Sequence, residues 1–102
     1  MSIKIGIDPV LALAKRTDAV KAECRKRIMS TANATAQMNM TAAASAGRMD
    51  APQLQTWGAA LAWVDAMRSA CPTLIANAAA DYLGDAAWPA IPEGVPELVS
   101  SY

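Results

Sequence analysis

The sequence contains no histidine and no phenylalanine, and only two of its 102 residues are cysteines. Without histidine, the chain lacks the commonest general base and a major metal ligand. Cys24 and Cys71 are widely separated and have no histidine to complete a recognisable zinc-binding set. No glycine-rich phosphate loop and no nucleophile motif occurs. We therefore expect no enzyme activity and no catalytic, cofactor-binding or metal-binding residue.

Long hydrophobic runs are also missing. No apolar run approaches the roughly 20 residues that a membrane-spanning helix requires. The opening MSIKIGIDP lacks the apolar core of a signal peptide, which predicts a cytoplasmic protein with no membrane partner. The hydrophobic fraction is 54%, but much of it is alanine, which buries little area. These features predict one small domain with a thin core, supported by self-association or by a partner.

The strongest helix signal covers residues 50–71. Asp50 can cap the helix start, and Pro52 suits the first turn, where a missing N–H costs little. An apolar seam with heptad-like spacing follows, which comprises Leu54, Trp57, Leu61, Val64 and Cys71. Ala60, Trp63 and Met67 widen this face. Trp57 is assigned to the core because it lies on the seam, whereas Trp63 suits either the core or a partner contact equally well.

A second helix is predicted to begin at Asp8 and Pro9, as cap and first helical residue. Its apolar stripe consists of Leu13, Val20, Cys24 and Ile28, and the two cysteines are expected to be small hydrophobic residues rather than a disulfide. Residues 30–49 either continue this helix or restart after a cap at Ser30 or Thr31, with Gly47 as the C-terminal cap. Met38 and Met40 are assigned to flexible packing. Residues 9–47 and 50–71 thus predict an all-α fold, as an antiparallel helical hairpin or small bundle.

Proline changes the pattern after residue 71. Pro72 is expected to interrupt or kink the helix, with helical character from residue 73 to residue 83 and a stop at Gly84. The remainder carries Pro89, Pro92 and Pro96, which predict an extended tail and no folded element. The chain thus divides into an extended arm at 1–8, a helical domain at 9–84 and an extended tail at 85–102.

Apolar residues at both ends of the chain are the candidates for partner binding. Ile3, Ile5 and Ile7 alternate with other residues, as in a short strand or extended arm that another chain would cover. Trp88 and Ile91 are expected to anchor the tail, either on the hairpin or in a groove of a partner. The full candidate set is Ile3, Ile5, Ile7, Trp63, Trp88, Pro89, Ile91 and Pro92.

The net charge is zero, but the two halves of the chain are oppositely charged. Residues 1–48 carry eight basic and three acidic residues, a net charge of +5, and residues 49–102 carry one basic and six acidic residues, a net charge of −5. Such halves attract within one chain, which we favour, or between copies. The run Arg25, Lys26, Arg27 suggests a nucleic-acid patch, but no aromatic residue is interleaved with it. A solvated helix face is favoured, and nucleic acid is disfavoured as a partner.

Two stretches of the chain carry a family resemblance. The first stretch covers residues 20–39 and the methionine that follows. The positions in it that match the sequence pattern of the family are Lys21, Ala22, Glu23, Arg27, Ile28, Gln37, Asn39 and Met40. Residues 57–92 match an aromatic-rich helix with Met67 and Arg68, followed by Trp88, Pro89, Ala90, Ile91 and Pro92. With these stretches the chain resembles small tail proteins of tailed bacteriophages, in particular tail or tail-fibre assembly chaperones.

The resemblance implies a non-enzymatic helper that binds a tail-fibre or tail-tube component and guides its folding or oligomerisation. The implied tail-directed segment is Trp88, Pro89, Ile91 and Pro92. The isoleucine-rich arm departs from the pattern, which leaves a second reading: a minor tail or fibre-attachment subunit retained in the virion, packed as a homo-oligomer in a symmetric ring. A small basic-helix nucleic-acid-binding protein is a third reading. The implied location is the host cytoplasm or, for the second reading, the virion tail.

Overall fold

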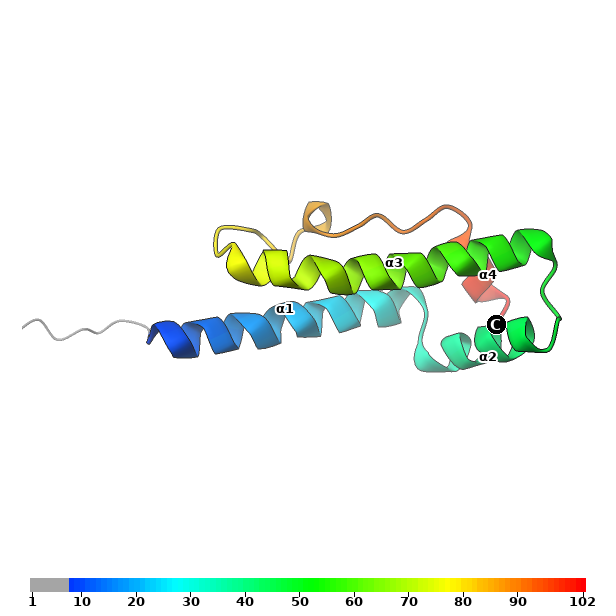
Figure 1. Ribbon diagram of the computed structural model, residues 1–102, viewed down its shortest axis with the longest axis horizontal. Helices are drawn as coiled ribbons and strands as arrows, with labels where there is room; N and C mark the ends of the chain where they lie inside the picture. The colour runs from blue at the N-terminus through cyan, green and yellow to red at the C-terminus, as the bar shows by residue number, and fades with distance from the viewer. Residues whose placement is uncertain (1–7) are drawn as a thin grey trace, which may run out of the picture.

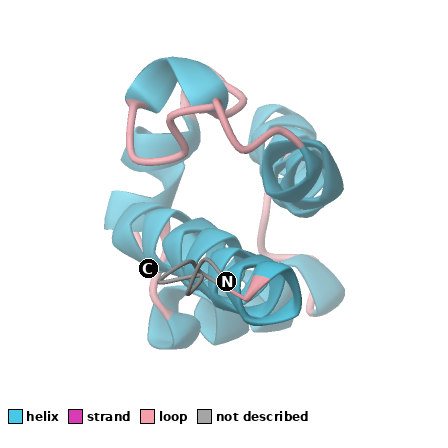
Figure 2. Ribbon diagram, turned by 90° about the vertical axis from the view of Figure 1, so that its left-hand side faces the viewer, coloured by secondary structure: helices cyan, strands magenta, loops and turns pink. Residues whose placement is uncertain are grey.

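The computed structural model describes residues 8–102, so the candidates Ile3, Ile5 and Ile7 lie outside the described residues. Within this range the helices are α1 (Pro9–Thr31), α2 (Ala34–Ser45), α3 (Ala51–Ala76), a 3-10 turn η1 (Asp85–Ala87) and α4 (Val95–Ser100). Figure 2 shows only helices and loops over the described residues, which confirms the all-α class. None of these helices is both long and apolar enough to cross a membrane.

Helices α1 and α3 lie side by side and run in opposite directions (Figure 1). Asp8 caps α1 as predicted, because its carboxylate accepts a 2.9 Å hydrogen bond from the Val10 amide. Val20, Cys24 and Ile28 of the predicted stripe are buried. Leu13 belongs to the same stripe but is 55% exposed. The reason is length: α1 starts beyond the end of α3, so its first turns have no helix to cover them.

The chain breaks between α1 and α2 instead of continuing as one helix. Asn33 caps α2 by accepting a 2.8 Å hydrogen bond from the Ala36 amide, so the cap is neither Ser30 nor Thr31. Gly47 follows the end of α2 with φ of 70°, and the Arg48 amide donates to the Ala43 carbonyl at 2.9 Å. This left-handed glycine cap confirms the predicted role of Gly47.

Helix α3 begins as predicted and buries only part of its predicted apolar face. The side chain of Asp50 accepts from the Gln53 amide at 2.8 Å while Gln53 caps the Asp50 amide at 2.9 Å, which makes a capping box. The buried residues of α3 are Trp63, Met67, Cys71 and Leu74. Leu54 and Leu61 of the predicted seam are 43% and 48% exposed. The prediction is therefore wrong at Leu54 and Leu61, whereas Cys71 is buried and Val64 packs against the buried residues. Helix α1 and Trp88 cover the part of the predicted apolar face that is centred on Met67.

The end of α3 also differs from expectation. The helix passes through Pro72 and continues to Ala76, so the predicted interruption at Pro72 is wrong. Burial of Cys71 and Leu74 on either side holds this turn helical. Residues 77–84 then form turns instead of the predicted helix. The carboxamide of Asn77 accepts from the Ala79 amide and the carboxylate of Asp81 accepts from the Leu83 amide, each at 3.2 Å. Such local hydrogen bonds compete with helix formation.

Arg16 of α1 holds the carbonyl end of α3. Its guanidinium donates to the carbonyls of Leu74 at 2.8 Å, Asn77 at 2.7 Å and Ala80 at 3.0 Å. It also lies over the ring of Tyr82, 5.2 Å from the centroid. A cation at the C-terminus of a helix is favourable for the helix dipole. Arg16 thus caps α3 and fixes the following turns against α1.

Residues 85–102 return along α3 and end near α2 (Figure 1). Gly94 takes φ of 87°, and Val95 then begins α4, whose Val95 and Leu98 are buried. The prediction of a wholly extended tail is therefore wrong over residues 95–100. Pro96 lies in the first turn of α4, where its missing amide costs little.

The core has two clusters. The larger one joins α1, the second half of α3 and the tail, and its buried members are Val20, Cys24, Ile28, Trp63, Met67, Cys71, Leu74 and Trp88. The smaller one consists of Met40, Ala43, Met49 and Leu98, with half-buried Trp57 against it. Met40 is therefore a packing residue as predicted, whereas Met38 is 72% exposed.

Cys24 and Cys71 are both buried and unbonded to each other, as predicted, and both belong to the larger cluster. Burial, together with a hydrogen bond and charge repulsion from Cys71, raises the pKa of Cys24 to about 11 from 9.0. Below pH 9 the thiolate fraction of Cys24, and hence its alkylation rate, should be about 100-fold lower than for an unfolded cysteine. Iodoacetamide labelling followed by mass spectrometry, with the urea-unfolded chain as control, measures this ratio.

The same shift predicts a pH dependence of stability. The raised folded-state pKa means that the unfolded chain loses its proton first as the pH rises from 9 towards 11. The contribution of Cys24 is fully present below pH 9 and should be lost across this interval, which Cys24→Ala should not show. Equal urea midpoints at pH 8 and pH 10.5 in the parent chain would contradict it.

Candidate functional site

A groove of about 580 Å³ runs between the tail and the two long helices. We call it the tail groove. One wall comes from α1, the floor from Trp63 and Met67 of α3, and the other wall from residues 85, 86 and 88–91 of the tail. The residues of α1 in the lining are Lys26, Arg27, Ser30 and Thr31. Three segments that are far apart in the sequence form this groove, so no single stretch of the sequence could predict it.

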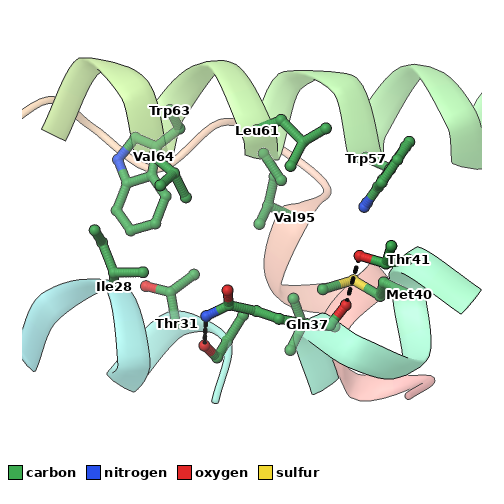
Figure 3. A pocket seen from close by; sticks show the side chains of 13 residues that line it. Ile28, Thr31, Gln37, Met40, Thr41, Trp57, Leu61, Trp63, Val64 and Val95 are labelled. Carbon is green, nitrogen blue, oxygen red and sulfur yellow. Dashed lines mark hydrogen bonds between the residues drawn. The ribbon is translucent and has the colours of Figure 1, made fainter. Parts of the chain in front are cut away.

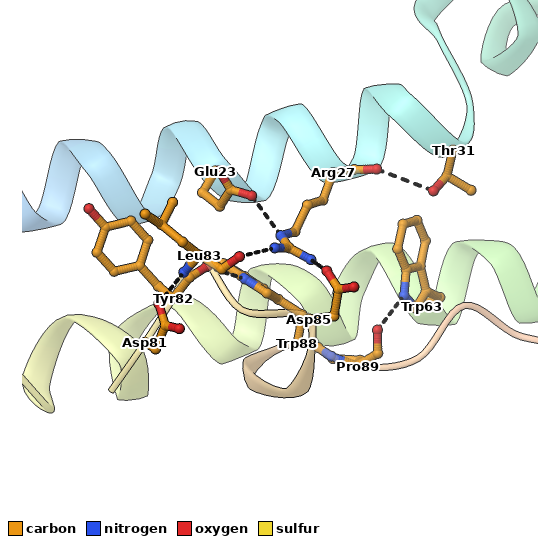
Figure 4. Close-up of polar contacts among 10 residues, drawn as sticks. All are labelled: Glu23, Arg27, Thr31, Trp63, Asp81, Tyr82, Leu83, Asp85, Trp88 and Pro89. Atoms are coloured by element: carbon orange, nitrogen blue, oxygen red, sulfur yellow. Dashed lines mark hydrogen bonds and ion pairs between the residues drawn. The ribbon is translucent and has the colours of Figure 1, made fainter. Parts of the chain in front are cut away.

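The two buried tryptophans attach the tail to the helices (Figure 4). The indole N–H of Trp63 donates to the Pro89 carbonyl at 3.1 Å, and that of Trp88 donates to the Tyr82 carbonyl at 2.7 Å. Trp63 is 6% exposed and Trp88 is 7% exposed. A buried indole N–H requires an acceptor, which the tail backbone supplies for Trp63 and the turn before the tail supplies for Trp88. The tail is therefore docked on α1 and α3 of the same chain.

Arg27 forms the polar contact beside these tryptophans (Figure 4). Its guanidinium donates to Glu23 at 2.7 Å, to Asp85 at 2.9 Å and to the Leu83 carbonyl at 2.9 Å, and it lies over the Trp88 ring. Burial acts to lower the pKa of Arg27, but the hydrogen bonds to Asp85 and Glu23 outweigh it and raise that pKa. Arg27 thus joins α1 to the tail, which sequence reasoning missed because its partners lie far along the chain.

Arg27→Ala is expected to lower the free energy of unfolding by about 1–2 kcal/mol, because it leaves the Leu83 carbonyl and the Glu23 carboxylate without their donor. Asp85→Asn should leave stability close to that of the parent chain, because the Asp85 side chain is 99% exposed. Urea unfolding followed by circular dichroism compares the two variants. Equal losses would show that the Asp85 ion pair, and not the contacts with Glu23 and Leu83, joins α1 to the tail.

The structure brings four of the candidate partner-binding residues together. Trp63, Trp88, Pro89 and Ile91 all border the tail groove. Ile91 is 46% exposed at the rim, so it is the apolar member that an incoming chain can reach. Pro92 is half-buried and lies outside this lining.

A smaller apolar cavity of about 70 Å³ lies where α1, α2, α3 and α4 meet (Figure 3). Met40, Trp57, Val64 and Val95 line it together with neighbouring side chains. The polar groups at its edge are already engaged within the chain: the carboxamide of Gln37 donates to the Ala32 carbonyl at 2.8 Å, and the hydroxyl of Thr41 donates to the Gln37 carbonyl at 2.9 Å. This cavity is a small, mostly apolar packing gap between the two core clusters.

Within residues 8–102, no three His, Cys, Asp or Glu side chains gather as a metal site would require. The tail groove therefore offers apolar contact beside two cations, Lys26 and the already paired Arg27, an arrangement suited to holding a chain segment. No protein-family model matches the sequence, and no curated protein or solved structure matches it either.

Proposed function

We propose that this chain is a non-enzymatic protein that assists the assembly of the tail or tail fibre of a tailed bacteriophage. The proposal starts from the resemblance over residues 20–39 and 57–92. One structural observation supports it: Trp88, Pro89 and Ile91 of the resembling tail segment border a single groove with Trp63. A client segment in that groove would lie against apolar side chains and the exposed Ile91.

The proposed roles of the groove residues follow from how far each side chain is buried. The antiparallel pair α1 and α3 is the platform. Trp63 holds the tail on it through its hydrogen bond to the Pro89 carbonyl, and Trp88 does so through its burial in the larger core. These two residues act on the client indirectly, by placing the groove wall. Ile91 is the direct contact, because nearly half of its surface remains exposed. Exposed apolar side chains beside a groove are favoured sites for anchoring a partner.

The test is co-expression of the tagged chain with the tail and fibre proteins encoded beside it. We expect one identified tail or fibre protein to co-purify. Ile91→Glu should reduce its recovery at least tenfold, because a charge would be buried against the client. Leu11→Glu is the matched control, since Leu11 is also half-exposed but lies on α1 outside the groove. Equal recovery with both variants, or no tail or fibre protein at all, would refute the proposal.

A structural subunit retained in the virion is the second candidate, and one observation favours it. Among residues 8–102 the only ion pairs are those of Arg27 with Glu23 and Asp85, and just the latter joins the two oppositely charged halves. The remaining charges are left for contacts between copies in a homo-oligomer. Mass spectrometry of purified particles separates the candidates: a fixed copy number indicates a subunit, and presence only in lysate with a tail or fibre protein indicates a helper.

A further inference from the structure

A second groove, of about 380 Å³, opens on the other side of α1 from the tail groove. Lys21 and Arg25 of α1 and Arg68 of α3 border it, and we call it the basic groove. Lys21 and Arg25 are four residues apart and therefore occupy one face of α1. Arg68 reaches the same groove from the neighbouring helix, and the two buried thiols lie at its base.

No acidic side chain among residues 8–102 forms an ion pair with the three cations of the basic groove. Both ion pairs among residues 8–102 belong to Arg27, which borders the opposite groove. The positive charges of Arg68 and Arg25 both act to lower the pKa of Cys24, against the larger effect of burial, so both lie near the groove base. Like charges gathered in one groove repel one another, and a bound anion would relieve that repulsion.

We propose that the basic groove binds a dianionic phosphate group. A phosphate group carries a charge of roughly −1.5 to −2 at neutral pH, whereas a single carboxylate would balance only one of the three cations. Two guanidinium groups supply planar forks that match phosphate oxygens, and a lysine supplies a flexible point charge. Inorganic phosphate and a phosphate monoester present the same chemistry to these groups.

The placement of Arg25 separates this proposal from a nucleic-acid patch. The run Arg25, Lys26, Arg27 is not one surface, because Arg25 borders the basic groove while Lys26 and Arg27 border the tail groove. The third cation, Arg68, comes from another helix. The result is a local cluster sized for one anionic group, not a stripe that follows a nucleic-acid backbone.

The test is thermal unfolding of the full chain with sodium phosphate near neutral pH, against sodium chloride at matched ionic strength. We expect the midpoint to rise with phosphate and saturate. Arg68→Gln should raise the midpoint without phosphate, because it relieves repulsion, and should weaken the apparent phosphate affinity at least tenfold. Arg48→Gln is the charge-matched control, because Arg48 is exposed and borders neither groove.

Adenosine monophosphate distinguishes the source of the group: tighter binding than inorganic phosphate indicates an ester, and equal binding indicates free phosphate. The proposal is overturned if chloride stabilises equally, or if phosphate stabilises the Arg68→Gln variant as much as the parent chain. Tighter, steeply salt-dependent binding of duplex DNA would also overturn it, in favour of a nucleic-acid surface. None of these outcomes depends on Ile91 or the tail groove, so the proposed assembly function stands or fails separately.

Discussion

Trp63→Ala is expected to lower the free energy of unfolding by about 3–5 kcal/mol, because it empties the centre of the larger core. Trp63 is 6% exposed, and its indole also holds the tail through the Pro89 carbonyl. A domain of this size has only about 5–15 kcal/mol of stability in total, so the loss should be a large fraction of it. Urea unfolding followed by circular dichroism measures the change.

Two matched variants separate the causes of this loss. Trp63→Phe keeps most of the ring but removes the hydrogen bond to Pro89, and should cost about 1–2 kcal/mol. Trp57→Ala removes a tryptophan from the same helix, but Trp57 is only half-buried against the smaller core, so its loss should be clearly less than that of Trp63→Ala. A greater loss at Trp57 than at Trp63 would mean that α3 buries the seam expected from the sequence.

Arg16→Ala is expected to cost about 2 kcal/mol, because three carbonyls at and beyond the end of α3 lose a charged donor. The loss should be local in part, so residues 77–84 should become accessible to protease before the rest of the chain. Urea unfolding gives the total effect, and limited proteolysis with fragment masses gives the local one.

Arg16→Lys should restore little of this stability. A lysine ammonium keeps the charge but lacks the planar fork that reaches the carbonyls of Leu74, Asn77 and Ala80 together. Lys15→Ala is the control for charge alone, because Lys15 is exposed and makes no such contact. If Arg16→Lys keeps the full stability, or Lys15→Ala loses as much as Arg16→Ala, the positive charge near the helix end and not the planar guanidinium of Arg16 stabilises the chain.

The starts of α1 and α3 were predictable because their signals are local. Asp8 and Asp50 each accept a hydrogen bond from an amide within the first turn, that of Val10 or of Gln53. The stripe of α1 was also predictable, since Val20, Cys24 and Ile28 stand out from charged neighbours. The prediction that Leu13 is buried was wrong only because its exposure depends on where α3 ends.

The buried face of α3 was not predictable from periodicity. Alanine and large apolar residues surround this helix on most sides, so the seam through Leu61 and the face through Met67 are both consistent with the pattern. The choice is made by Trp88 and α1, which cover the Met67 side. The tail groove was hidden for the same reason, because Arg27 meets Asp85 and Trp63 meets Pro89 only after the tail folds back.

Helix α4 had a signal that the proline content obscured. Gly94 permits the positive φ before the helix, Pro96 fits the first turn, and Glu97 is acidic in that turn. The prolines predict an extended tail, but Pro96 comes two residues after Gly94 and fits the first turn of a helix. The burial of Val95 and Leu98 then stabilises a helix that is too short to form alone.

Pro72 divides α3 in a way that matters for amide hydrogen exchange. It has no N–H, so the Arg68 carbonyl receives no helical hydrogen bond from residue 72. The segment from Pro72 to Ala76 is therefore joined to the preceding turn by one hydrogen bond fewer than in a helix without proline. Arg16 holds the other end of this segment from a different helix, through the Leu74 carbonyl. We therefore expect the amides of the last turn of α3 to exchange faster in Arg16→Ala than in the parent chain.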